Sequence, residues 1–359
     1  MNSFDFLGSD QTLFSNPDAL DPDFVPKLLP HRENEQRVLV NAIHPLLHNR
    51  TGISIIAHGP SGVGKTASTR RILMDLEELS EADNIAKVFI NCWKANTTYK
   101  VMSEIAKQLG FKFTHNLKTN EIIDRVIDKL KSREGVVIIL DEADKSDDYD
   151  FLYHILENIK KRTVILLTND SEWSGKLDFR ISSRLTPELV EFKSYTYSET
   201  FDILKERIKY AFYQNVWDDA TIKMLAEKAS EYKDIRFGIT LLKLSGEIAE
   251  AESEKKITVT HVESAIKKLP DFKIKSSSDF NDAENFVLKI CEEFSGKTTG
   301  ELYKLYQKRG GKKSEKTFKR VLDILSKKRI ITQRPTGEGF QGRSSIIEYR
   351  SPEKKLTDY

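Results

Sequence analysis

The 359-residue chain has only two cysteines, Cys92 and Cys291, and they show no metal-ligand spacing. We expect both to be buried, reduced thiols, which argues against a disulfide-stapled secreted fold. Long hydrophobic runs are also absent, because no stretch approaches the roughly 20 apolar residues that a membrane span needs. The first 23 residues are acidic and polar and contain no apolar signal core. We therefore expect a cytoplasmic protein with no membrane partner.

The balance of residue types is that of a folded protein. Hydrophobic residues make up 39% of the chain and charged residues 31%, and the length suggests two or three domains. The net charge of +2 is unevenly distributed: residues 301–350 contain 14 Lys and Arg against 5 Asp and Glu, which leaves −7 for the rest. This concentration favours a polyanion-binding face near the C-terminus over an evenly solvated surface.

A glycine-rich segment has the full spacing of a phosphate-binding loop, with an apolar run before it and a helical pattern after it. Its glycines let backbone N–H groups converge on a phosphate. Lys65 can reach the β- and γ-phosphates, and the Thr66 hydroxyl can ligate Mg²⁺. The predicted nucleotide contacts of the loop are Gly59, Pro60, Ser61, Gly62, Val63, Gly64, Lys65, Thr66 and Ala67. The sequence therefore predicts a site for ATP or ADP with Mg²⁺.

Strand-like runs alternate with helical patterns over residues 21–196, which predicts an α/β domain with a mostly parallel sheet. The predicted strands are residues 53–57, 87–91, 136–140 and 164–168. Residues 197–270 are helical throughout, and residues 1–20 are expected to be a flexible N-terminus. A proline and three consecutive serines then predict a linker before a third domain at residues 279–350.

Polar residues follow two of the predicted strands. Asp141 is placed to hold Mg²⁺, together with Thr66, and Glu142 to polarise the attacking water. Asn169, after the next strand, is placed to hold that water or sense the γ-phosphate, although asparagine also follows strands simply as a turn former. Arg184 is a candidate for stabilising the transferring phosphoryl group of a neighbouring subunit, with a surface salt bridge as the alternative.

The C-terminal domain is predicted to be a winged helix-turn-helix. Apolar residues at Phe318, Val321, Leu322 and Leu325 place the opposite face of their helix in solvent, and two strands joined by a glycine-rich turn follow. Such a helix suits the major groove of DNA and the turn suits the backbone or minor groove, although a winged helix can also dock proteins. The candidate DNA contacts are Lys313, Ser314, Lys316, Thr317, Lys319, Arg320, Arg334 and Arg343.

The order of these motifs resembles an AAA+ ATPase: phosphate loop, Asp-Glu strand, strand ending in Asn, Ser-Arg box, and a helical lid with its own arginine, Arg236. Further segments narrow the resemblance to the archaeal origin-recognition and cell-division-cycle replication initiators. They are residues 26–33, 90–92, 192–195 and 241–250, together with the winged helix. It covers the chain from about residue 21 to residue 350. The resemblance implies further nucleotide contacts from His31, Arg32, Tyr195, Arg207 and Arg236, and a helical insertion near residues 94–118 that touches DNA.

The resemblance implies a nucleoid-associated replication initiator that binds double-stranded origin DNA under the control of ATP. Its ATPase would be slow and act as a switch, and its further partners would be the replicative helicase and other initiator paralogues. Two alternatives remain. One is an ATPase-regulated winged-helix transcription or signalling switch, and the other is a clamp-loader-like AAA+ subunit that grips DNA without sequence preference.

Overall fold

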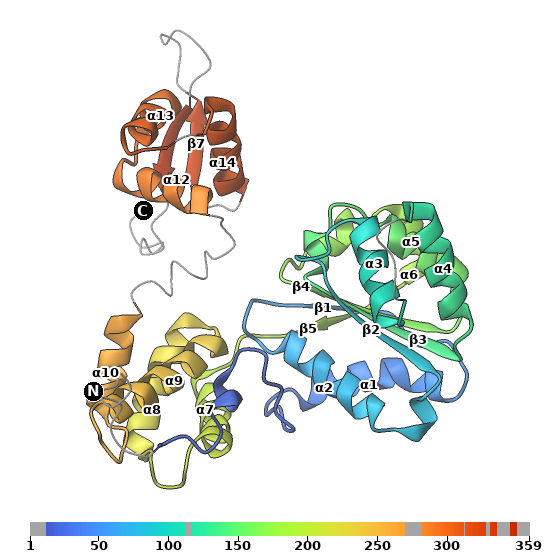
Figure 1. The fold of residues 1–359 in the computed structure, drawn as a ribbon, viewed down its shortest axis with the longest axis horizontal. Helices are drawn as coiled ribbons and strands as arrows, with labels where there is room; N and C mark the ends of the chain where they lie inside the picture. Colours follow the sequence, from blue (N-terminus) through green and yellow to red (C-terminus); the bar gives the residue numbers. More distant parts are fainter. Residues whose placement is uncertain are drawn as a thin grey trace, which may run out of the picture. The chain divides into compact units, whose positions relative to one another are not determined.

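The computed structural model describes residues 12–111, 117–269, 282–311, 313–327, 331–335 and 345–349. Its contacts divide the chain into two compact units, Met1–Lys268 and Leu269–Tyr359 (Figure 1). The first unit contains a sheet-based core and a group of helices that we call the lid, because these helices lie against the phosphate loop. The division falls close to the predicted end of the lid at residue 270.

Five parallel strands form the sheet of the first unit. They are β1 (Ile55–His58), β2 (Ile85–Asn91), β3 (Gly135–Asp141), β4 (Arg162–Thr168) and β5 (Glu188–Glu191), in the order β2-β3-β4-β1-β5. Every residue of β3 is buried, as expected of a parallel sheet covered on both faces. The four predicted strands are confirmed to within two residues at each end. The edge strand β5 was missed because only one of its four residues, Val190, is buried.

Helices cover both faces of the sheet (Figure 1). On one face lie α1 (Glu33–Leu47) and α2 (Lys65–Glu77), and on the other lie α3 (Thr98–Gln108), α4 (Thr119–Lys131), α5 (Asp150–Asn158) and α6 (Phe179–Leu185). Helix α4 shows why the sequence is helical here: Ile122, Ile123, Val126, Ile127 and Leu130 are all buried and share one face. This confirms the α/β class with its parallel sheet.

The lid consists of α7 (Tyr197–Ala211), α8 (Asp219–Tyr232), α9 (Ile235–Ala251) and α10 (Val259–Lys268). Local capping fixes where its helices begin. Thr196 and Glu199 form a reciprocal capping box at α7, and the carboxylates of Asp218 and Asp234 accept backbone N–H groups at the starts of α8 and α9. The beginning of α9 is therefore held in place directly after Asp234.

The prediction of a flexible N-terminus was wrong for residues 12–20, while residues 1–11 lie outside the described part of the chain. Residues 12–20 pack against the lid. Thr12 Oγ1 and Leu13 N each donate to the Glu250 carboxylate at 2.7 Å, and Ser15 N donates to Ala211 O at 2.9 Å. The reason is hydrophobic: Leu13, Phe14, Ala19 and Leu20 are all buried.

Phe14 is expected to contribute most to this attachment. Its ring lies 4.7 Å from that of Phe212, and a Cβ atom at Gly246 would come within 2.3 Å of it. Phe14→Ala should therefore lower the free energy of unfolding by about 3 kcal/mol. Phe179→Ala is the control, since Phe179 is 82% exposed and its loss should change stability by less than about 0.5 kcal/mol. Equal effects in urea denaturation would contradict the assignment.

The second unit contains α12 (Asp282–Glu293), β6 (Lys297–Thr298), α13 (Thr299–Lys308), α14 (Glu315–Lys327), β7 (Ile331–Pro335) and β8 (Ser345–Tyr349). The strands form an antiparallel sheet in the order β6-β8-β7, and the three helices pack on a shared core that includes Leu302, Phe318 and Ile347. A capping box of Thr298 and Glu301 starts α13. This order of helices and strands is consistent with the predicted winged helix.

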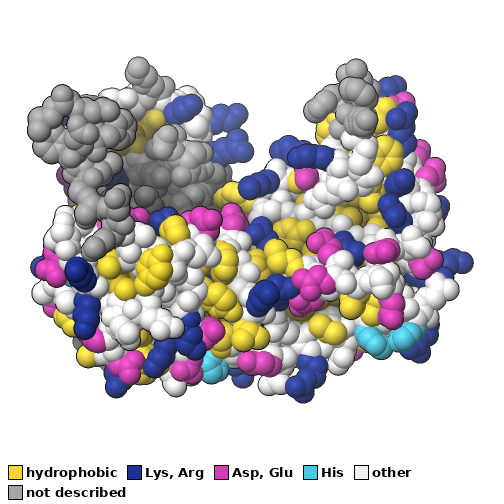
Figure 2. Space-filling view, turned by 60° about the horizontal axis from the view of Figure 1, so that its bottom comes forward, with side chains coloured by type: hydrophobic (Ala, Val, Ile, Leu, Met, Phe, Trp, Pro, Cys, Tyr) yellow, Lys and Arg dark blue, Asp and Glu magenta, His cyan; other side chains and the backbone are white. Residues whose placement is uncertain are grey.

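The surface carries both signs of charge. On the face that Figure 2 presents, basic and acidic side chains are intermixed, with hydrophobic side chains between them.

Within the described ranges, no helix combines the length and the apolar character needed to cross a lipid bilayer.

Candidate nucleotide-binding site

A pocket of about 330 Å³ lies where the carboxyl ends of three strands meet the lid. That volume is within the range of small-molecule sites. The core contributes Ser61 to Ala67 of the phosphate loop, together with residues that follow β3 and β4. The lid contributes α7 and the start of α9, and residues 22–30 contribute a third wall. The predicted site residues that line it are Ser61, Gly62, Val63, Gly64, Lys65, Thr66, Ala67, Asp141, Glu142, Asn169, Tyr195, Arg207 and Arg236.

Lys65 is a buried cation at the phosphate end of the pocket, with 7% of its surface exposed. Its Nζ donates to Gly59 O at 2.8 Å, to Pro60 O at 2.7 Å and to Asn169 Oδ1 at 2.8 Å. Burial lowers the pKa of Lys65 to about 8, and the nearby Asp141 carboxylate opposes that shift. An ammonium group that is desolvated and bonded to neutral oxygens is suited to an anionic ligand.

The phosphate loop needs glycine where other groups approach closely. Gly64 has a φ of 91°, and a Cβ there would lie 2.7 Å from Tyr195 Oη. Arg32 braces the loop from outside the pocket: its Nε donates to Val63 O at 2.8 Å and its guanidinium lies 3.9 Å from the centre of the Tyr195 ring. Burial raises the pKa of Tyr195 to about 12, so this hydroxyl stays neutral beside the loop.

Thr66 and Asp141 fit a magnesium site. Thr66 Oγ1 lies 3.0 and 3.2 Å from the two carboxylate oxygens of Asp141. Burial raises the pKa of Asp141, and the hydrogen bond from Thr66 opposes the shift. Within the described residues no three His, Cys, Asp or Glu side chains group to hold a metal, so this site suits an ion that takes its other ligands from phosphate and water. Such an ion would neutralise charge on the phosphates.

Glu142 lies directly after Asp141 in a left-handed backbone conformation, with a φ of 52°. Conformations of this kind cost a non-glycine residue about 1–3 kcal/mol and cluster at functional sites. The turn ends β3 and leaves the Glu142 side chain in the pocket lining, half-buried. Asn169 is on the same edge of the sheet and holds Lys65.

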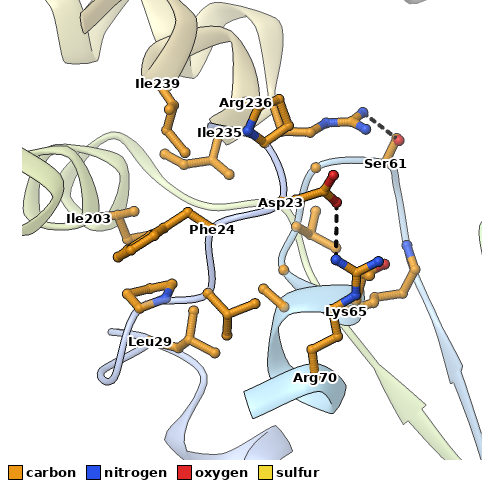
Figure 3. A pocket seen from close by; sticks show the side chains of 18 of the residues that line it. Asp23, Phe24, Leu29, Ser61, Lys65, Arg70, Ile203, Ile235, Arg236 and Ile239 are labelled. Atoms are coloured by element: carbon orange, nitrogen blue, oxygen red, sulfur yellow. Dashed lines mark hydrogen bonds and ion pairs between the residues drawn. The ribbon is translucent and has the colours of Figure 1, made fainter. Parts of the chain in front are cut away.

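The lid touches the phosphate loop directly. Arg236 Nη2 donates to Ser61 Oγ at 2.7 Å, and Ile235 N donates to Gly62 O at 3.3 Å. Gly62 has a φ of 73°, and a Cβ there would lie 1.9 Å from the Asp234 carboxylate. Figure 3 shows Arg236 reaching from the lid to Ser61 above Lys65. A ligand in this pocket would contact the core and the lid together.

The apolar half of the pocket was not predicted. It is lined by Phe24, Val25, Leu28, Leu29, Ile203, Tyr210, Ile235 and Ile239. Figure 3 shows Phe24 and Leu29 on the same side as Ile203 and Ile239, away from Lys65. The Arg207 guanidinium lies 5.1 Å from the centre of the Phe24 ring and donates to Ala19 O at 2.8 Å; burial lowers the pKa of Arg207 to about 10. This half suits a flat base. The prolines at 22, 26 and 30 were the signal that could have found residues 22–30.

Five predicted nucleotide-site residues do not line the pocket: Gly59, Pro60, His31, Arg32 and Arg184. Gly59 and Pro60 supply the backbone carbonyls that accept from Lys65 Nζ. His31 is partly exposed and its Nε2 lies 3.1 Å from an Asp202 carboxylate oxygen. Arg32 acts through Val63 and Tyr195, as described above. Arg184 is exposed on α6, where it lies 4.9 Å from the centre of the Tyr153 ring and 3.9 Å from the Glu157 carboxylate. The contact with Glu157 is the surface salt bridge that the sequence left open as the alternative role of Arg184. Arg184 is not part of the pocket of its own chain.

Six of the eight predicted DNA contacts lie at or just before the start of α14. Phe318 is buried there, whereas its neighbours Lys313, Ser314, Lys316, Thr317, Lys319 and Arg320 are exposed. Ser314 and Thr317 share a hydrogen bond of 3.0 Å. Arg334 is part of β7, but its side chain and the whole of Arg343 lie outside the described residues.

A phosphate loop, acidic strand end and helical lid around one pocket define an AAA+ ATPase. Two family models agree with this class: residues 48–172 match the AAA domain, and residues 201–267 match the Cdc6 AAA+ ATPase-type lid domain. The chain belongs to the ORC1-type DNA replication proteins. It is 32% identical to ORC1-type DNA replication protein 1 of Archaeoglobus fulgidus, over 99% of this chain and 92% of the relative.

Other relatives support the same family. ORC1-type DNA replication protein 1 of Sulfurisphaera tokodaii is 33% identical, over 93% of this chain and 89% of that protein. Among solved structures, the Aeropyrum pernix ORC1 protein in complex with DNA matches with a TM-score of 0.80 and 26% identity, over 95% of this chain and 94% of that chain. Cdc6p of Pyrobaculum aerophilum has the same fold, with a TM-score of 0.64 and 20% identity over 94% of each chain. The resemblance found in the sequence is thereby confirmed.

Glu142→Gln should separate binding from hydrolysis. The substitution keeps the size of the side chain and removes its charge, so ATP should still bind while single-turnover hydrolysis falls by about 10²-fold or more. Glu191→Gln is the control, because Glu191 is an exposed carboxylate outside the pocket lining. Wild-type hydrolysis in the Glu142 variant would remove this residue from the reaction.

Proposed function

We propose that this chain is an ATP-dependent replication initiator that binds double-stranded origin DNA and helps to recruit the replicative helicase. The observation that carries the proposal is the pocket shared by the phosphate loop and the lid, in a chain whose second unit presents a basic helix face. The similarity to a protein solved on DNA supports the DNA part. A genome-wide map of bound DNA tests the whole proposal: enrichment at replication start sites is expected, whereas enrichment at promoters would favour a transcription switch.

The nucleotide acts as a switch between two arrangements of the lid relative to the core. ATP with Mg²⁺ occupies the pocket, with the base in the apolar half and the phosphates at Lys65. Thr66 and Asp141 would hold the magnesium ion, Glu142 would polarise the water and Asn169 would orient it. Arg236 senses the phosphates, because its present partner Ser61 belongs to the loop that would carry them. Hydrolysis is slow because one part of the catalytic site is supplied by another subunit.

That part is Arg184, which acts on the nucleotide of a neighbouring initiator. The proposal is supported by its exposure on α6, outside the pocket of its own chain. Arg184→Ala should therefore slow hydrolysis by about 10³-fold in assemblies of subunits and leave the basal rate of monomers unchanged. The measurement is the ATPase rate as a function of protein concentration. An equal loss in demonstrably monomeric protein would contradict action in trans.

The second unit is the main DNA-binding module, and α14 enters the major groove. Lys316→Ala with Lys319→Ala should weaken binding to every duplex similarly and reduce the slope of log affinity against log salt by about 0.9 for each phosphate that the protein no longer neutralises. Arg320→Ala should instead cost about 1–3 kcal/mol of discrimination if it contacts a base. Fluorescence anisotropy with origin and scrambled duplexes measures both. An unchanged slope in the double variant would reject the assignment, and equal affinity for both duplexes would favour a clamp-loader-like role.

A further inference from the structure

Seven basic residues gather at the amino edge of the sheet, opposite the nucleotide pocket. They come from residues 48–52, 129–133 and 158–162, which contain no Asp or Glu. We call them the amino-edge cluster, and its members are Arg50, Lys129, Lys131, Arg133, Lys160, Lys161 and Arg162. The cluster lies before β1, β3 and β4, so it is about 20 Å from the pocket along the length of β4.

Hydrogen bonds hold the three segments side by side. Thr51 Oγ1 donates to Lys160 O at 3.0 Å, Gly52 N donates to Arg162 O at 3.2 Å, and Val136 N donates to Lys161 O at 3.0 Å. Lys131 Nζ reaches the α5 end through Asn158 Oδ1 at 3.2 Å. The strands that follow these segments are neighbours in the sheet, so the cations form one surface and not three.

The cluster lacks counter-charges. None of its members makes an ion pair with a carboxylate in the part of the chain that the structure describes. Two of the three acids that flank these segments have other partners: Glu134 accepts from Asn84, and Glu157 accepts from Tyr153. The third, Asp128, is exposed and, among the described residues, makes no ion pair with the cluster. The Nε atoms of Arg133 and Arg162 are buried without any hydrogen-bond partner. A buried N–H group without an acceptor costs free energy, and an anion bound at the same guanidinium would offset part of that cost.

Helix dipoles explain only part of this arrangement. Lys129 and Lys131 lie in the last turn of α4, where cations are favourable, and Arg162 donates to the Ile159 carbonyl at the end of α5. Arg50 and Lys160 lie two or three residues beyond the last residues of α1 and α5, and their side chains are exposed and make no hydrogen bond within the described residues. These groups are available to an external ligand.

We propose that the amino-edge cluster is a second DNA-binding surface, which contacts the phosphodiester backbone without reading sequence. Protein interfaces have an apolar centre, but the large hydrophobic residues of the three segments, Leu130 and Ile159, are buried. The polar residues beside the cations, Asn49, Thr51 and Ser132, are of the types that contact phosphate. A phosphate backbone therefore fits this surface better than an acidic protein does.

The test is a variant of the full chain in which Arg50, Lys129 and Lys160 are all replaced by Ala. These side chains make no hydrogen bond or ion pair within the described residues, so the fold should be unaffected, as urea denaturation would verify. The matched control replaces Lys205, Lys209 and Lys228 by Ala, which removes the same charge from the lid. Each of those lysines is already paired with a carboxylate, at 3.1, 2.7 and 2.9 Å.

Binding to a long duplex of mixed sequence is measured by fluorescence anisotropy across a salt series. The triple variant should make the slope of log affinity against log salt shallower by about 0.9 for each phosphate that is no longer neutralised, or about 2.7 in all. The control variant should leave the slope unchanged. An unchanged slope, or an equal fall in the control, would overturn the proposal. So would a loss of binding to polyglutamate with full retention of DNA binding, which would indicate an acidic protein partner.

The winged helix is tested separately in the same assay. A variant with Lys316→Ala and Lys319→Ala reports on the second unit alone, and combining both sets should add their reductions of slope if the two surfaces bind one duplex. A reduced slope only in the winged-helix variant would sink the amino-edge cluster and leave the proposed function intact. A reduced slope only in the amino-edge variant would support the amino-edge cluster and contradict the proposal that the second unit is the main DNA-binding module.

Discussion

The nucleotide site depends on the burial of one ammonium group. Lys65 is almost completely covered and bonds to two carbonyls of its own loop and to the Asn169 amide. Those three oxygens come from two segments that meet only because β1 and β4 are adjacent parallel strands. A polyphosphate supplies the negative charge that these neutral oxygens lack. One buried cation thus depends on three features of the core: the order of the strands, the curled phosphate loop and the acidic end of β3.

Much of this support could be predicted from the sequence. Buried parallel strands are continuous apolar runs, and the polar residues after them mark the edge where a ligand binds, so Asp141 and Asn169 could be placed from the sequence pattern. The spacing of the phosphate loop was sufficient to predict Lys65 as a phosphate contact and Thr66 as a ligand of Mg²⁺. These signals are local, because each lies within one strand and the turn that follows it.

The parts that could not be predicted depend on contacts between distant segments. Phe24 and Leu29 become pocket residues only because residues 12–23 lie against the lid, where Glu250 and Ala211 bind them. No local pattern marks an extended segment that packs on a helix more than 200 residues later. In the same way, the sequence pattern did not reveal that Arg32 braces the phosphate loop through Val63 instead of lining the pocket.

Helix α9 begins at the phosphate loop and ends at the N-terminal segment. Its 17 residues span about 26 Å, from Ile235 beside Gly62 to the turn that carries Glu250. A rigid rod of that length amplifies motion: a tilt of about 5° at the loop displaces the far end by roughly 2 Å, more than a hydrogen bond tolerates. Thr12 and Leu13 are bonded to that end of α9, so they would move with it. The displacement relative to the core would instead act where the N-terminal segment reaches α2, at the 3.0 Å ion pair between Asp23 and Arg70.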